Sequence, residues 1–140
     1  MTVSVERTRT GDTSYSDVVT VTGPGRWVHV AGQLAFDENR RVIGVDVATQ
    51  ANRCFDRIET LLQDVGGNLT NVVSITVYLT ELEQYPDFDR VRAERFQEHR
   101  PASAAVKVAG LLFGALIEIA AIAFVPVDEM GDAKRLDPKR

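Results

Sequence analysis

The chain has 140 residues, of which 44% are hydrophobic and 26% are charged, and this balance is typical of a single globular domain. Such a composition excludes a disordered chain, a collagen-like chain and a small disulfide scaffold. The formal net charge of −4 excludes a general electrostatic attraction to nucleic acid, so no nucleic-acid partner is predicted.

One domain is predicted over residues 1–127, followed by a flexible tail over residues 128–140, where charged residues gather with glycine and proline. Lys107 and Glu118 interrupt the longest apolar stretch, which is therefore too short to cross a bilayer, and no membrane partner is predicted. A single cysteine cannot form an internal disulfide, and residues 1–10 lack a signal-peptide pattern. Both observations predict a cytoplasmic protein.

The first predicted elements are two strands. Residues 18–22 are rich in β-branched side chains, a Gly-Pro-Gly turn follows, and residues 27–31 resume the strand pattern. We therefore predict that these two strands form a hairpin. After a second turn at residues 37–39, residues 42–44 are predicted to form a short strand.

A long helix is predicted next, because apolar residues recur at helical spacing over residues 47–65. Asp46 is a suitable N-cap, and Gly66 and Gly67 supply residues that tolerate the left-handed end of a helix. The positions of the apolar face are Val47, Ala51, Cys54, Phe55, Ile58, Leu61, Leu62 and Val65.

The second half of the chain is predicted to contain three strands, at residues 72–79, 104–108 and 116–125. A second helix opens near Pro86, which suits a first-turn position, and ends before Pro101. The side chains predicted to be buried are Val73, Ile75, Val77 and Leu79 of the first strand and Phe88, Val91 and Phe96 of the helix.

This element order predicts an α+β single domain with one mixed β-sheet and two helices on one face. Both faces of the final strand, residues 116–125, are mostly apolar. Because two helices can cover only one face, the other face must meet another chain or remain wet, and a large wet apolar face is unusual for a monomer. The sequence therefore predicts a homo-oligomer.

The common catalytic patterns are missing from the sequence. It has no Gly-x-Ser-x-Gly elbow, P-loop or Gly-x-Gly-x-x-Gly motif. Neither His29 nor His99 has a second ligand at metal spacing, so no metal site is predicted and His29 is interpreted as a structural strand residue. Cys54 lies on the apolar helix face, which indicates a buried, inert thiol.

Four segments in the middle of the chain follow one another in a recognisable order. They read VHVAGQ at residues 28–33, NVVSITVYLT at 71–80, RPASAAVKV at 100–108 and LIEIAAIA at 116–123. Together they resemble the RidA/YjgF family, also called endoribonuclease L-PSP, over residues 14–125.

The resemblance implies a chorismate-mutase-like (YjgF-like) fold, a homotrimer packed through sheet faces, and a small-molecule pocket at each subunit interface. Active members of the family hydrolyse reactive enamines and imines to 2-keto acids and ammonia. They need no metal or cofactor, and none is expected here.

The resemblance also shows where this chain departs from the family. Ser103 stands where the family has a carboxylate-binding arginine, Ala120 where it has a glutamate, Ala105 where cysteine is frequent, and Arg92 where asparagine is usual. Loss of a charged hydrogen bond removes about 1.5–3 kcal/mol, and loss of a general acid or base costs about 100- to 10,000-fold in rate. No catalytic residue is matched, so the usual 2-imino-acid reaction is not expected.

The residues predicted to line a ligand pocket are Tyr15, Gly32, Arg92, Ser103, Ala105 and Glu118. Alternative interpretations stay open for four of them. Tyr15 can be a surface packing residue, and Gly32 can be a strand glycine that allows a bulge. Glu118, which shares a face with Ala120 by strand alternation, is either an interface ion-pair partner or a displaced acid.

Arg92 is predicted to lie at the edge of the buried face of the second helix, next to Val91. In one interpretation it is a solvated charge paired with Asp89, and such exposed pairs contribute little stability. In the other it replaces the missing arginine and binds an anionic ligand.

Two functions follow from this pattern. The first is a hydrolase or deaminase of a reactive enamine or imine that differs from the usual 2-imino acids. The alternative is a non-catalytic module of the same fold that binds a metabolite or a protein. A ribonuclease, a third reading, is disfavoured by the acidic charge and by the missing His/Lys/Glu constellation.

Overall fold

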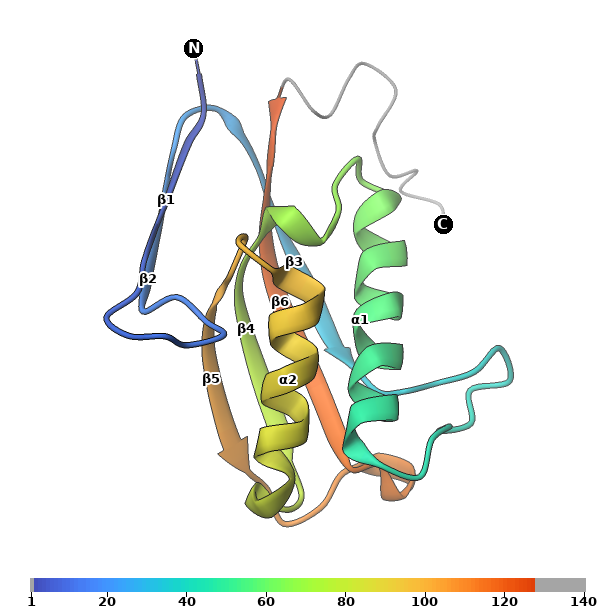
Figure 1. The fold of residues 1–140 in the computed structure, drawn as a ribbon. Coiled ribbons are helices and arrows are strands. Elements are labelled where there is room, and N and C mark those ends of the chain that lie inside the picture. The colour runs from blue at the N-terminus through green and yellow to red at the C-terminus, as the bar shows by residue number, and fades with distance from the viewer. Residues whose placement is uncertain (1, 128–140) are drawn as a thin grey trace.

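A computed structural model describes residues 2–127, and the predicted tail over residues 128–140 lies outside the described residues. The described residues form two sheets and two α-helices, with short 3₁₀ turns between them (Figure 1). The elements are β1 (Ser4–Thr8), β2 (Val18–Thr22), β3 (Gly25–Gln33), α1 (Val47–Gln63), β4 (Val72–Leu79), α2 (Tyr85–Phe96), β5 (Ala102–Lys107) and β6 (Ile117–Pro126).

The main sheet has the strand order β3-β6-β4-β5. β6 pairs antiparallel with both β3 and β4, whereas β4 and β5 are parallel and are joined through α2. Both helices pack against the same face of this sheet (Figure 1). The predicted α+β single domain, with a mixed sheet and two helices on one face, is confirmed.

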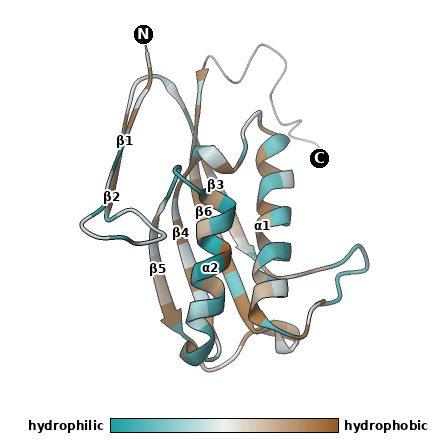
Figure 2. Ribbon diagram, viewed as in Figure 1, coloured by the Kyte–Doolittle hydropathy of each residue, from teal (hydrophilic) through white to brown (hydrophobic). Residues whose placement is uncertain are grey.

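Helix α1 forms as the periodicity predicts. The Asp46 side chain accepts a hydrogen bond from the backbone N–H of Thr49 at 2.8 Å, and Gly66 adopts a positive φ of 84° after the last turn. Every predicted apolar position is buried except Leu61, which is 42% exposed at the flank of the helix. Figure 2 shows brown, hydrophobic residues along the strands behind the helices, and α2 is largely teal.

Strand β4 buries alternate residues, as expected for a strand covered on one face. Ile75, Val77 and Leu79 point toward the helices and are buried. The prediction for Val73 is wrong, because the register against β6 shifts between Val72 and Ser74 and Val72 takes the buried position instead.

Two predictions for the N-terminal half are wrong. β2 does not form a hairpin with β3: it pairs with β1, a strand that the sequence did not predict, while β3 pairs with the apolar strand β6. Both β1 and β2 are largely exposed, so they carry no buried periodic pattern. Residues 42–44 form no strand, and only a single bridge joins Phe36 to Val42.

The face of the main sheet opposite the helices is open over the middle of the strands, and the β1–β2 hairpin approaches one end of it at Phe124. Side chains on this face surround a hollow of about 230 Å³ and include His29, Ser74, Thr76, Ala120 and Ile122. Farther along the face, Trp27 is 55% exposed and packs edge-on against Phe124, with ring centroids 5.1 Å apart. No helix of the described residues is long and apolar enough to span a membrane.

Candidate functional site

The most unusual side chain in the core is Arg92, near the middle of α2. It is only 1% exposed, whereas the sequence predicts it at the edge of the buried face of the helix, so that prediction is wrong, and so is the interpretation of Arg92 as a solvated charge. Arg92 follows Phe88 by four residues, so both side chains lie on the same face of α2, directed toward the sheet. A buried cation needs hydrogen bonds and a counter-charge.

The guanidinium of Arg92 has both. Its Nε donates to Ser14 Oγ at 2.7 Å, and its Nη1 donates to Ser103 Oγ at 2.8 Å. Its Nη2 donates to Tyr85 Oη at 2.6 Å and to Asp89 Oδ1 at 2.9 Å. Four of its five N–H groups are therefore occupied by these residues.

Aromatic rings surround the same guanidinium. Its central carbon lies 4.9 Å from the ring centroids of both Tyr15 and Phe88, and 5.5 Å from that of Tyr85. These distances are within the range of cation–π attraction. The rings therefore help to stabilise a charge that has left water.

The Asp89 carboxylate balances this charge. It accepts hydrogen bonds from Ser14 at 2.6 Å and from Arg92 at 2.9 Å. The bond from Ser14, followed by the bond and charge of Arg92, holds the pKa of Asp89 below its ordinary value. The Arg92–Asp89 pair is thus ionised and carries no net charge at neutral pH.

The N-terminal segment over residues 13–16 is fixed beside α2 and β5. The Ser16 backbone N–H donates to Pro101 O at 2.9 Å, and Ser16 Oγ donates to Arg100 O at 2.7 Å. Arg100 in turn donates to the carbonyl of Thr13. These contacts hold Tyr15 over the guanidinium of Arg92.

Together these elements enclose a pocket of about 470 Å³ at the β5 edge of the molecule. Its lining residues are Tyr15, Leu82, Tyr85, Arg92, Ser103 and Ala105. Four of the six residues predicted from the sequence therefore come together. Leu82 and Tyr85 were not predicted from the sequence. Tyr85 precedes Arg92 by seven residues, which is two helical turns. That spacing puts both side chains on the same helix face, so it could have identified Tyr85.

The other two predicted residues, Gly32 and Glu118, lie elsewhere. In the sheet register Glu118 is opposite Tyr78 and Ala120 is opposite Thr76, which confirms that both face the open side. Ser103 and Ala105 are opposite Ile75 and Val77 and so face the helices. Within one chain the predicted site is split between the two faces of the sheet.

Gly32 and Glu118 do meet each other. A Cβ atom on Gly32 would lie 2.5 Å from Glu118 Oε2, so the missing side chain leaves the space that this carboxylate occupies. The register between β3 and β6 also shifts between Val30 and Gln33, as predicted for a glycine that allows a bulge. Among the described residues, none forms an ion pair with Glu118.

The pocket offers hydrogen-bond donors and aromatic walls. None of its described lining residues is a carboxylate or an imidazole. Cys54 is fully buried, and burial raises the pKa of its thiol to about 12, so it is not a nucleophile. The described residues contain no group of three side chains that could hold a metal ion.

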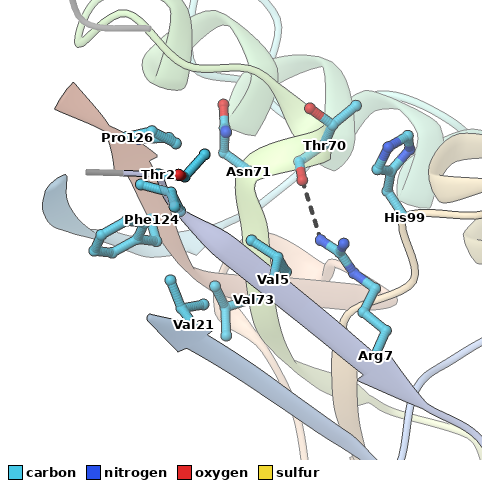
Figure 3. Close-up of a pocket in the computed structure, with 11 residues that line it drawn as sticks. Thr2, Val5, Arg7, Val21, Thr70, Asn71, Val73, His99, Phe124 and Pro126 are labelled. Atoms are coloured by element: carbon cyan, nitrogen blue, oxygen red, sulfur yellow. Dashed lines mark hydrogen bonds between the residues drawn. The ribbon is translucent and has the colours of Figure 1, made fainter. Parts of the chain in front are cut away.

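A second hollow, of about 460 Å³, lies between the β1–β2 hairpin and the main sheet (Figure 3). Val5, Val21 and Val73 form its apolar part, and Arg7 donates a hydrogen bond to Thr70 O at 3.2 Å at the other end. None of the six predicted pocket residues lines it.

Comparison with known proteins places this chain and its fold in a family. The family model described as Endoribonuclease L-PSP matches residues 8–125. The 3-aminoacrylate deaminase RutC of Acinetobacter baylyi is 39% identical over 99 residues, which cover 70% of this chain and 79% of that protein. The 2-iminobutanoate/2-iminopropanoate deaminase of Bos taurus is 34% identical over 110 residues, 78% of each protein.

A solved structure agrees with these relatives. The RidA structure from an Antarctic Psychrobacter species has a TM-score of 0.69 and is 32% identical, covering 85% of this chain and 93% of that one. The fold is thus of the RidA/YjgF type. The chain belongs to the endoribonuclease L-PSP family, and the resemblance seen in the sequence is confirmed.

Proposed function

We propose that this chain is a trimeric RidA-family protein that binds a small metabolite at each subunit interface and hydrolyses a reactive enamine or imine there. Water adds to the carbon of the C=N bond, and the carbon–nitrogen bond then breaks to give a carbonyl compound and ammonia. This balance requires no metal or cofactor. Another copy of the chain and the metabolite are its only proposed partners, and the single, buried Cys54 supports a cytoplasmic location.

The split site supports the trimer. The pocket at the β5 edge lacks a general acid or base among its described lining residues, while Glu118 stands beside Gly32 on the open face. A second copy that covers the β5 edge with its open face supplies Glu118 to the pocket. There this carboxylate positions or activates the attacking water.

The environment of Ser103 carries the proposal on substrate class. The family arginine is absent at this position, and Ser103 instead accepts a hydrogen bond from Arg92. Arg92 is paired with Asp89 and has four occupied N–H groups, so it makes a poor bidentate clamp for a carboxylate. We therefore propose a substrate other than the usual 2-imino acids.

Binding without catalysis is the alternative, and the two missing family residues favour it. Ser103 and Ala120 replace the arginine and the glutamate of the family. In that case the same interface pocket holds a metabolite, or the same surface holds a protein, and no bond is broken.

Ammonia release tests the enzyme proposal. The purified protein is given 2-iminobutanoate, made in place by an amino-acid oxidase, and in parallel the corresponding neutral imine amide. We expect little acceleration over buffer for the acid and clear acceleration for the amide. Rapid hydrolysis of the acid would contradict the proposed substrate class, and ligand binding with no hydrolysis of either compound would favour the binding module.

A paired substitution gives a sharper test of the substrate class. The double variant Ser103→Arg with Arg92→Asn restores the family's arginine and asparagine at these two positions, and it should raise hydrolysis of 2-iminobutanoate by about 10-fold or more, the effect of one charged contact. Ser103→Arg alone is the matched control, because its new guanidinium meets that of Arg92. Equal rates for the double variant and the unchanged chain would contradict the assignment of Ser103.

A further inference from the structure

The hydroxyl groups around Arg92 have different roles, which depend on where each O–H proton finds an acceptor. An arginine can only donate hydrogen bonds, so Ser14, Ser103 and Tyr85 each accept one from it. The O–H proton of each hydroxyl must then be directed to another acceptor. Ser14 donates its proton to Asp89 at 2.6 Å.

The O–H protons of Ser103 and Tyr85 have no acceptor among the described residues. Both residues line the 470 Å³ pocket, whereas Ser14 does not line it and is only 7% exposed. Two hydroxyl donors are therefore left available to the pocket. Arg92 makes them stronger donors, because a hydroxyl that accepts from a cation is polarised.

The guanidinium itself is poorly placed to bind an anion directly. The rings of Tyr15 and Phe88 flank it at 4.9 Å, and one N–H on Nη1 remains unoccupied by described residues. The bonds to Ser14 and Asp89 occupy the edges that a bidentate carboxylate would need. The ionised Asp89 also cancels its charge.

We propose that Ser103 and Tyr85 form a hydroxyl pair that recognises the carbonyl oxygen of a neutral small molecule, such as a carboxamide, in preference to a carboxylate. Burial costs a carboxylate much more hydration than it costs an amide, and this wall offers no net positive charge in return. Each hydroxyl oxygen also keeps a lone pair that can accept from an amide N–H. Leu82, Ala105 and the ring of Tyr15 contact the apolar remainder of the ligand.

This inference rests on the proposed function only in placing a ligand in the same pocket. Titration calorimetry tests it with two probes of one carbon skeleton, 2-oxobutanamide and 2-oxobutanoate. We expect the amide to bind about 10-fold more tightly or better. Ser103→Ala and Tyr85→Phe should each weaken amide binding by about three- to tenfold, the effect of one neutral hydrogen bond.

Thr60→Ala is the control. It removes an exposed hydroxyl of α1 that donates to Asp56 O and lines no part of this pocket, so it should leave the amide affinity within about twofold. Circular dichroism of each variant verifies that it is folded. If Tyr85→Phe unfolds the chain, Ser103→Ala alone decides, because Ser103 is only half-buried on β5.

Three results would overturn the inference: tighter binding of 2-oxobutanoate than of the amide, unchanged amide affinity in the hydroxyl variants, or binding of neither probe. Failure of the proposed function is seen separately, as absence of ammonia release. If amide binding depends on Ser103 and Tyr85 but no ammonia is released, the hydroxyl pair is supported and only the proposed catalysis is contradicted.

Discussion

Asp89 and Asp87 form two similar ion pairs on α2 that differ in burial. Both carboxylates bond an arginine three residues later, but Arg92 is 1% exposed and Arg90 is 60% exposed. Asp89 also accepts a hydrogen bond from Ser14. The Asp89–Arg92 pair therefore stabilises the wall of the pocket, whereas the Asp87–Arg90 pair is solvated.

We expect Asp89→Asn to lower the melting temperature at neutral pH and Asp87→Asn to change it little. The pKa of Asp89 is lowered in the folded state, so its contribution to stability is present above the unfolded pKa of about 4 and is lost as the pH falls through the folded pKa. Thermal unfolding of the three proteins between about pH 2.5 and 8 measures this.

The gap between Asp89→Asn and the unchanged chain should therefore shrink below about pH 4. A gap that is the same at every pH, or an equal effect of both substitutions, would show that the charge of Asp89 does not stabilise the fold.

At the residue scale, part of the pocket could be predicted from the sequence. The family resemblance located Ser103 and Ala105, because they lie in one of the four segments with a recognisable order, and Tyr15 lies within the range of that resemblance, residues 14–125. It gave no orientation for Arg92, since a cation next to Val91 is compatible with solvent as well as with burial. The partners that decide the matter, Ser14 and Tyr85, come from distant or unmarked positions.

Among the elements, those that bury an apolar face were predicted correctly. α1, β4 and α2 carry periodic patterns and β6 is mostly apolar on both faces, because each packs against the same core. β1 carries no periodic pattern, since it is short and exposed. β2 pairs with β1, and the sequence next to β2 does not encode this contact. Strand order depends on which edges are free, and this is a property of the whole sheet.

The open face of β6 gives a prediction at the same scale. Ile122→Asp places a charge at the hollow between His29 and Ser74, and burial of this face between subunits would make that charge costly. We expect dissociation to monomers, measured by light scattering. Leu61→Asp, at a 42% exposed position on α1, is the control and should leave the assembly intact.

A monomeric Leu61→Asp variant would show that the assembly uses α1 instead of the open face. An intact assembly in both variants would show that Ile122 lies outside every subunit contact.

For the whole molecule, the split site bears on the symmetry of the proposed assembly. The β5 edge with its pocket and the open face with Glu118 are different surfaces, so the proposed contact between them is heterologous. Heterologous contacts leave no unpaired surface only when they close into a ring, and the ring that the family resemblance implies has three members.

Light scattering through a dilution series should therefore report a mass three times that of the 15.4 kDa chain. The mass should stay constant on dilution, because apolar faces of this kind associate tightly. A species of one chain mass at all concentrations would contradict the trimer and with it the completion of the pocket by Glu118.

The attachment of residues 13–16 also has a consequence for the order of folding. Ser14 and Asp89 are 75 residues apart in the sequence, and Thr13 and Arg100 are 87 apart. Contacts of such separation close large loops and form slowly, and they require α2 and β5 to be in place already. We therefore expect the pocket to be completed late in folding and to open early. A ligand that contacts the docked segment should then slow amide hydrogen exchange of residues 13–16, so that occupancy of the pocket stabilises the native state.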